Sequence, residues 1–130
     1  MKIEHFAINV TDAAGMAQWW AKNLDLTIIR ADKVEPFIHF LSDDGHQTLL
    51  EIYTNPKGEF PDYANQSIFT FHIAFAVEDI EAEIERLLAA GAQPSGDILT
   101  MPNNDRLGFV RDPWGVCIQI LQRATPLIPS

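Results

Sequence analysis

The chain has 130 residues, of which 47% are hydrophobic, and its formal net charge at pH 7 is −9. This length suits one domain with a substantial core, and the acidic charge disfavours nucleic acid and anionic membrane surfaces as partners. A single cysteine, Cys117, excludes an intrachain disulfide, and the sequence lacks both a signal-peptide core and a membrane-spanning apolar run of about 20 residues, so we expect a cytoplasmic protein.

The first half of the chain predicts a strand, a helix and three further strands. Residues 5–10 alternate small or polar side chains with bulky ones, as half-buried strands do. Thr11 or Asp12 can cap the helix that follows, which carries an apolar stripe. Three apolar segments then predict strands at residues 26–32, 36–42 and 47–54.

The second half repeats this order, with His72 standing 67 residues after His5 (72 − 5 = 67). Residues 69–77, "FTFHIAFAV", alternate bulky side chains with small or polar ones and predict a strand. Asp79 can cap the next helix, and Gly91 can end it. Further apolar segments predict strands at residues 96–102, 106–112 and 116–122.

The repeat predicts an α+β fold made of two tandem βαβββ modules. We expect the first module at residues 1–54, a linker at residues 55–67 and the second module at residues 68–123, all within one domain of residues 1–130. The remaining residues form a tail that frays or packs on a partner chain.

Side-chain parity predicts a polar position on the first and fourth strand of each module. Bulky residues fill one face of the first strands, which leaves the histidines on the other face. In the fourth strands an acid and an amide each stand between two apolar residues and point away from them. The four polar residues expected on the face opposite the helices are His5, Glu51, His72 and Gln119.

The segments "HFAINV", "HIAFAV" and "RDPWGVCIQIL" give the chain a resemblance to the vicinal oxygen chelate superfamily. This superfamily includes glyoxalase I, methylmalonyl-CoA epimerase, extradiol dioxygenases, and the fosfomycin- and bleomycin-resistance proteins. The resemblance implies that the two modules form a concave eight-stranded mixed sheet, a glyoxalase-like cup, around one divalent metal ion. The family's ligand positions fall on His5, Glu51, His72 and Gln119, and the family also implies a homodimer.

This ligand set suits a divalent first-row ion, with Zn, Ni, Co, Mn and Fe left open, and leaves coordination positions for a small oxygenated metabolite. Such a site stabilises an enolate by Lewis-acid catalysis. In glyoxalase I a proton-transferring glutamate occupies the position of Gln119, and an amide has no useful basicity. Glu51 is then the candidate catalytic base, and Gln119 also breaks the dioxygenase ligand triad. We therefore expect lyase or isomerase chemistry rather than oxygen activation.

Several alternatives stay open at this stage. The cup can also serve a metal-free protein that binds or sequesters a drug, as bleomycin-resistance proteins do. Arg30 and Arg106 are candidates for holding a substrate carboxylate, because the guanidinium presents a fork matched to two oxygens. For His39 and His46 a structural role is expected.

Overall fold

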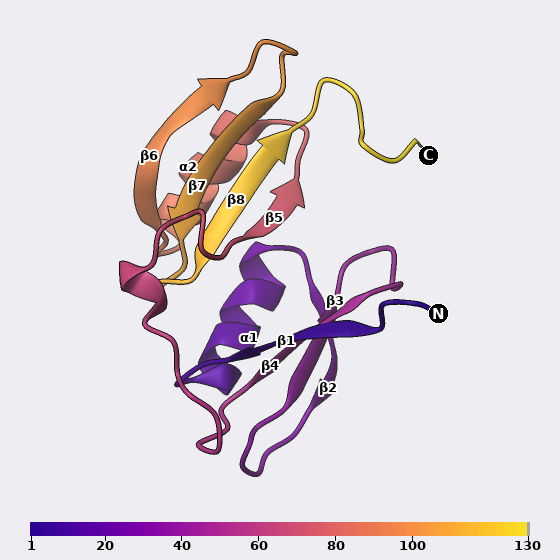
Figure 1. Cartoon of the computed structure of the whole chain (residues 1–130), viewed down its shortest axis with the longest axis vertical. Helices are drawn as coiled ribbons and strands as arrows, with labels where there is room; N and C mark the ends of the chain where they lie inside the picture. Colours follow the sequence, from indigo (N-terminus) through magenta and orange to yellow (C-terminus); the bar gives the residue numbers. More distant parts are fainter. Residues whose placement is uncertain (130) are drawn as a thin grey trace. The chain divides into compact units, whose positions relative to one another are not determined.

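The structure, a computed structural model, describes residues 1–129, which form two compact units, Met1–Pro61 and Asp62 onward. The first unit contains, in chain order, β1 (His5–Asn9), α1 (Ala13–Asn23), β2 (Thr27–Ala31), β3 (His39–Ser42) and β4 (Leu49–Tyr53) (Figure 1). The second contains a short 3-10 helix η1 (Tyr63–Asn65), then β5 (Ile73–Ala76), α2 (Ile80–Ala89), β6 (Gln93–Thr100), β7 (Arg106–Arg111) and β8 (Cys117–Gln122). The predicted pair of βαβββ modules is confirmed. None of the helices within residues 1–129 has the length and hydropathy needed to cross a bilayer.

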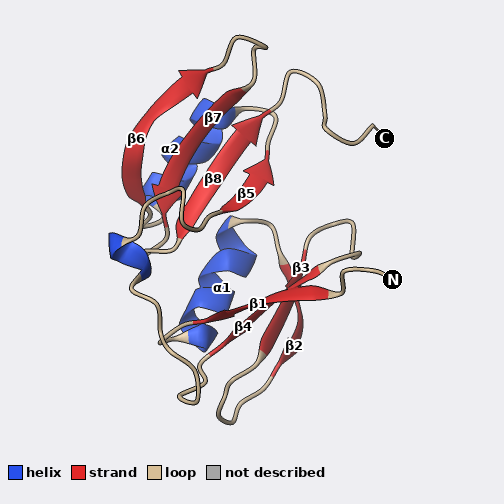
Figure 2. Ribbon diagram, viewed as in Figure 1, coloured by secondary structure: helices blue, strands red, loops and turns tan. Residues whose placement is uncertain are grey.

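Each unit folds its strands into a four-stranded mixed sheet, in the orders β1-β4-β3-β2 and β5-β8-β7-β6. The first strand of each unit pairs in parallel with the fourth, and the remaining pairs are antiparallel. The helix of each unit packs on one face of its own sheet (Figure 2). We call the opposite face of each sheet its open face.

The core of the first unit lies between α1 and the sheet. Ile8 of β1 and Ile52 of β4 are register partners, and both are buried on the helix face. Leu41 of β3 has the same parity, and the three side chains pack with Met16 and Trp20 of α1, which are fully buried. The alternation read from residues 5–10 therefore separates a packed face from an open one, as predicted.

In the second unit, α2 approaches the sheet closely because β7 carries Gly108 beneath it. A Cβ at that position would lie 2.7 Å from Cδ1 of Ile84 on the helix. Val110, Ile118 and Ile120 share this face and are buried. The helix face of the second sheet is thus an aliphatic core of the kind that its sequence predicted.

Aspartates cap both helices: Asp12, one of the two candidates for the first helix, and Asp79, as predicted for the second. The Asp12 carboxylate accepts a hydrogen bond from the Gly15 amide at 3.0 Å, and the Asp79 carboxylate accepts one from the Ala82 amide at 3.1 Å. Such caps stabilise a helix by about 1 kcal/mol each, because they satisfy amides that have no partner within the helix. α2 ends before Gly91, whose φ is +108°.

The strand predicted for residues 69–77 is shorter than expected, since β5 begins only at Ile73. The Ser67 hydroxyl and carbonyl accept hydrogen bonds from the amides of Phe69 and Thr70, which turns the chain before the strand. Phe69 is consequently 87% exposed rather than packed. The alternation itself holds from Phe71 onward.

The segment "DPWG" forms the turn between β7 and β8. The fully buried Asp112 carboxylate accepts hydrogen bonds from the amides of Trp114 and Val116, both at 2.9 Å. Gly115 has a φ of +93°, and a Cβ there would lie 2.6 Å from Cβ of Ala64 in η1. This position therefore needs glycine both for the turn and for the approach of η1.

Asp105 fixes the start of the C-terminal tail in the second unit. Its carboxylate accepts hydrogen bonds at 2.8 Å from the guanidinium of Arg123 and from the amide of Ala124. Asn103 adds a side-chain hydrogen bond. The hydrogen bond from the Ala124 amide, followed by that from Arg123, lowers the pKa of Asp105.

We expect Ile118→Ala to lower the free energy of unfolding by about 2–5 kcal/mol, because it leaves a cavity in the aliphatic core. Ile128→Ala is the matched control, since that side chain is 85% exposed, and it should cost about 0.5 kcal/mol or less. Urea denaturation measures both. Equal costs for the two substitutions would contradict the assignment of the core.

The lowered pKa of Asp105 predicts a pH dependence of stability. The folded protein binds the Asp105 proton less tightly than the unfolded chain does, so the carboxylate stabilises the fold above the unfolded value, near 4. The contribution disappears as the pH falls through the lower folded value. In urea denaturation, Asp105→Asn should therefore be less stable than the wild type at pH 7, and the difference should shrink below about pH 4. Asp97→Asn is the control, since this exposed substitution should change the free energy of unfolding at pH 7 by about 0.5 kcal/mol or less.

Candidate functional site

The open face of the first unit brings together three residues that we call the first half-site: His5, Phe40 and Glu51. Glu51 of β4 pairs with Phe40 of β3 on one side and with Ala7 of β1 on the other. His5 lies two residues before Ala7 and so shares its face. Its Nε2 is 3.6 Å from Oε1 of Glu51. The structure therefore places the two ligands predicted in this unit side by side.

The orientation of His5 is fixed by its other nitrogen. Nδ1 is 2.8 Å from Oε1 of Glu4, and because a carboxylate only accepts, Nδ1 carries the hydrogen. The ring also stands edge-on to Phe40, with centroids 5.4 Å apart. In the neutral imidazole, Nε2 then presents its lone pair toward Glu51.

The open face of the second unit carries the equivalent group, the second half-site: His72, Phe109 and Gln119. Gln119 of β8 pairs with Phe109 of β7 and with Ala74 of β5. His72 lies two residues before Ala74 and makes an edge-on contact with Phe109, with centroids 5.6 Å apart. Each unit therefore repeats a histidine, a phenylalanine and an oxygen-bearing side chain in the same places.

His72 has the same tautomer as His5, for a similar reason. Its Nδ1 is 2.8 Å from the backbone oxygen of Ile68, so Nδ1 donates and Nε2 keeps its lone pair. Metal-ligating histidines nearly always donate their second nitrogen to a carboxylate or a backbone carbonyl in this way. Both predicted histidine ligands thus have the partner that a ligand histidine needs.

The separation within the first half-site also suits two ligands of one ion. Two donors bound at about 2.1 Å in adjacent positions of an octahedral ion lie about 3.0 Å apart, so the 3.6 Å between His5 and Glu51 would have to shorten slightly on binding. Over residues 1–129 no group of three or more His, Cys, Asp or Glu side chains is suited to a metal. A half-site alone therefore offers two donors, fewer than the three or four that bind a first-row ion.

The other histidines have the structural roles predicted for them. His39 is buried on the helix face of its sheet, where its Nδ1 is 2.7 Å from the backbone oxygen of Phe37. His46 lies in the turn after β3, with Nδ1 2.7 Å from the Ser42 hydroxyl. Cys117 shares the parity of Gln119 but is buried, and desolvation raises the pKa of its thiol. The thiolate that a metal prefers is therefore disfavoured at this cysteine.

Of the two arginine candidates, only one points to an open face. Arg106 has the parity of Gly108, which faces α2, and it is ion-paired with Glu81 at the start of that helix. Arg106 is therefore turned away from the open face, and α2 supplies a carboxylate partner for it. Arg30 pairs in register with Phe40 and lies on the open face of the first unit. A hydrogen bond to Asp32 raises the pKa of Arg30.

Sequence reasoning missed two residues that position the chain beside the half-sites. The Asn9 amide donates to the backbone oxygens of Asn55 and Glu59, both at 2.9 Å, and so holds the loop after β4. Arg111 donates to the backbone oxygens of Tyr63 and Gln66 and so fastens η1 to β7. Backbone carbonyls are present at every residue, so nothing in the sequence indicated these partners.

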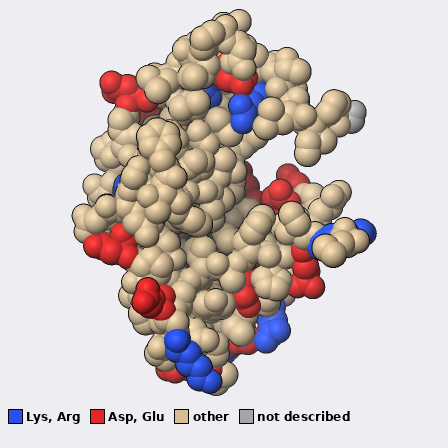
Figure 3. All heavy atoms as spheres, viewed as in Figure 1, with Lys and Arg blue, Asp and Glu red and all other residues tan. Residues whose placement is uncertain are grey.

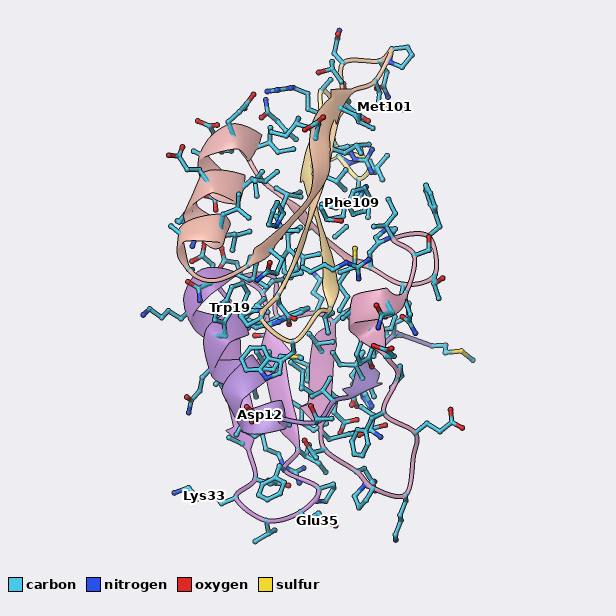
Figure 4. The ribbon with its side chains drawn as sticks, turned by 90° about the vertical axis from the view of Figure 1, so that its left-hand side faces the viewer. Asp12, Trp19, Lys33, Glu35, Met101 and Phe109 are labelled. Atoms are coloured by element: carbon cyan, nitrogen blue, oxygen red, sulfur yellow. The ribbon has the colours of Figure 1, made fainter. Side chains whose placement is uncertain are left out.

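The open faces of the two units differ in character. On one side of the second half-site the neighbours are apolar, with Leu107 paired to Leu121 and to Leu99, and on the other side Arg111 shares the parity of Phe109. Figure 4 shows Phe109 on the side of this sheet away from α2, and the same surface is largely uncharged in Figure 3. The first unit instead carries Arg30 and Glu51 on its open face. The two half-sites are therefore alike in geometry but not in charge.

Comparison with known families gives one match that covers most of the chain. A family profile described as "Glyoxalase/Bleomycin resistance protein/Dioxygenase superfamily" matches residues 2–120. A search among curated proteins finds none that matches the chain.

Solved structures share the fold at low sequence identity. TnmS3, described as an antibiotic binding protein from Streptomyces sp. CB03234, is 16% identical, with a TM-score of 0.70 over 95% of this chain and 97% of that one. A superfamily member from Sphaerobacter thermophilus DSM 20745 is 16% identical, with a TM-score of 0.74 over 95% and 98%. A glyoxalase-related enzyme from Fulvimarina pelagi is 18% identical, with a TM-score of 0.71 over 95% and 88%. At such identities the likeness shows the fold alone.

The hydrogen bonds to Nδ1 predict the tautomers of the two half-site histidines. At a pH where the imidazoles are neutral, long-range 1H–15N correlation spectra should show His5 and His72 protonated on Nδ1. Glu4→Ala should weaken this preference in His5 and leave it in His72, whose acceptor is a backbone oxygen. Protonation of His72 on Nε2 would contradict the assignment.

Proposed function

The chain belongs to the Glyoxalase/Bleomycin resistance protein/Dioxygenase superfamily, and we propose that it is a metal-dependent enzyme of lyase or isomerase type. The observation that carries this proposal is the orientation of the two histidines. In each unit an acceptor fixes Nδ1–H and leaves Nε2 free on the open face, and in the first unit Nε2 is 3.6 Å from a carboxylate oxygen. His39 and His46 are also hydrogen-bonded through Nδ1. His5 and His72 differ from them in lying on an open face, and His5 also in having a carboxylate beside Nε2.

The proposed ligands of one divalent ion per site are His5, Glu51, His72 and Gln119. Two neutral imidazoles, one carboxylate and one amide oxygen are a donor set that such ions accept. When bound, the ion would supply Lewis-acid stabilisation of negative charge on the oxygens of a small oxygenated metabolite. With one formal negative charge from the protein, the site would stay net positive and favour an anionic substrate.

Glu51 is the proposed proton-transfer residue, since Gln119 cannot act as a base. Its side chain is 12% exposed, so a substrate can reach the carboxylate while most of the group is held in place. His5 lies beside it, and Phe40, its cross-strand partner, covers the adjacent surface of the sheet. A base in this place would remove a proton from a carbon next to a chelated oxygen.

The metal content of protein purified without an affinity tag or chelator tests the proposal. We expect near-stoichiometric metal in the wild type by plasma mass spectrometry and a loss of at least about tenfold in affinity in His72→Gln, because a ligand is removed. His46→Gln is the matched control, since His46 is bonded to Ser42 and should leave the metal content unchanged.

Glu51→Gln separates the two roles of this residue. Metal that survives in Glu51→Gln, together with loss of solvent proton exchange into a bound 2-oxo acid, would support Glu51 as the base. A wild-type protein that takes up no zinc, nickel, cobalt, manganese or iron would contradict the enzyme proposal.

A metal-free protein that binds a small molecule is the second candidate, and the open face of the second unit favours it. Leu99 is 55% exposed there, beside Leu107 and Phe109, which is an apolar surface suited to a flat ligand. TnmS3 is described as an antibiotic binding protein and shares the fold. This candidate predicts that bleomycin or a similar aromatic compound binds equally well to the wild type and to His72→Gln in the absence of metal.

A further inference from the structure

Arg30 reaches the open face of the first unit only because β2 contains a bulge. Ile28 pairs with Leu41, but the next partner of β3, Phe40, pairs with Arg30 rather than with Ile29. Regular alternation would have placed Ile29 opposite Phe40 and turned Arg30 toward α1. Bulges commonly re-aim a side chain beside a functional site.

Asp32 holds the Arg30 guanidinium in place but uses only some of its hydrogen-bond donors. Nε and Nη2 of Arg30 donate to the two carboxylate oxygens of Asp32 at 3.0 and 2.8 Å. Of the five N–H groups of an arginine, three remain, two of them on Nη1. Among the described residues, no hydrogen bond uses that nitrogen. One edge of the fork is therefore anchored, and the other can accept a second carboxylate.

Arg30 lies in the same row of the sheet as the first half-site. The row runs from Arg30 through Phe40 to Glu51 on three neighbouring strands. Adjacent strands are about 4.8 Å apart, so about 10 Å separates the backbones of its two ends. The guanidinium lies over the Phe40 ring, 5.9 Å from its centroid, and so leans toward Glu51. A short carbon chain spans the remaining gap.

The charges of this row suit a ligand with two different ends. Arg30 is the only cationic side chain among Arg30, Phe40 and Glu51. Asp32 and Glu51 each carry a negative charge. These charges repel an anionic ligand unless a cation is bound at the Glu51 end. In β6 of the second unit, Ser95 takes the equivalent place opposite Phe109, so the second unit has no arginine at this position.

We propose that Arg30 binds the distal carboxylate of the substrate, which is therefore a small 2-oxo or 2-hydroxy dicarboxylic acid chelated at the His5 and Glu51 end. This inference rests on the proposed metal-dependent function and names its substrate class. Phe40 lies beneath the carbon chain of such a molecule, and Asp32 keeps the guanidinium in position.

Two five-carbon acids that differ only at their far end test the proposal. 2-Oxoglutarate carries the second carboxylate, and 2-oxopentanoate has a methyl group in its place. Isothermal titration of the cobalt-loaded protein should give a Kd for 2-oxoglutarate at least about tenfold lower than for 2-oxopentanoate. Arg30→Gln should remove this preference and leave 2-oxopentanoate binding unchanged. Arg30→Lys should retain part of it, since the charge stays but the fork is lost.

Arg86→Gln is the matched control, because Arg86 is also a surface arginine paired with a carboxylate, that of Glu83 on α2. It should behave as the wild type with both acids. Equal affinity of the metal-loaded wild type for the two acids would overturn the role of Arg30, as would a preference that persists in Arg30→Gln. Failure of the wild type to retain cobalt, measured on the same samples, would instead overturn the proposed function and the inference with it.

Discussion

The pairing of the first strand of each unit with the fourth is the constraint on which the rest depends. β1 and β4 run parallel, with Ala7 opposite Glu51, and β5 and β8 repeat this with Ala74 opposite Gln119. Because side chains alternate, one register decides at once which residues enter the core and which line the open face. A slip of one residue would bury Glu51 against the helix. Because the aliphatic core fixes the register, it also keeps the half-site residues on the open face.

Most of the fold could be predicted because its signals are local and periodic. Alternation marked the strands, and the aspartates at positions 12 and 79 marked the helix starts. The late start of β5, at Ile73 rather than at residue 69, could not be predicted from alternation, because the Ser67 hydroxyl accepts a hydrogen bond that turns the chain there. Similar hydroxyl-to-amide bonds are available to any serine, so the sequence does not say which of them form.

The sequence predicted which residues lie on the open faces, but not the groups that hydrogen-bond to them and orient them. Parity assigned His5, Glu51, His72 and Gln119 to open faces, and the strand registers agree for each unit by itself. The acceptor of His72 is a backbone oxygen in a turn, which has no sequence signal. The bulge that aims Arg30 also escaped notice, because "LTIIRAD" has no glycine to mark it. The residues that orient a site are therefore harder to predict than the residues that form it.

The two units keep the same scaffold and carry different residues on it. Their equivalent positions hold His5 and His72, and Phe40 and Phe109, so the scaffold of each half-site is the same. The differences lie at the ends of each row, where one unit has Glu51 and Arg30 and the other has Gln119 and Ser95. Acid–base chemistry and carboxylate recognition both need charge, and at these positions only the first unit carries it. The second unit has the amide of Gln119 instead, with leucines nearby. An amide can act as a ligand or pack, but it does not take up a proton at neutral pH. Under the proposed function, the residues that move a proton and bind a carboxylate would both belong to the first unit.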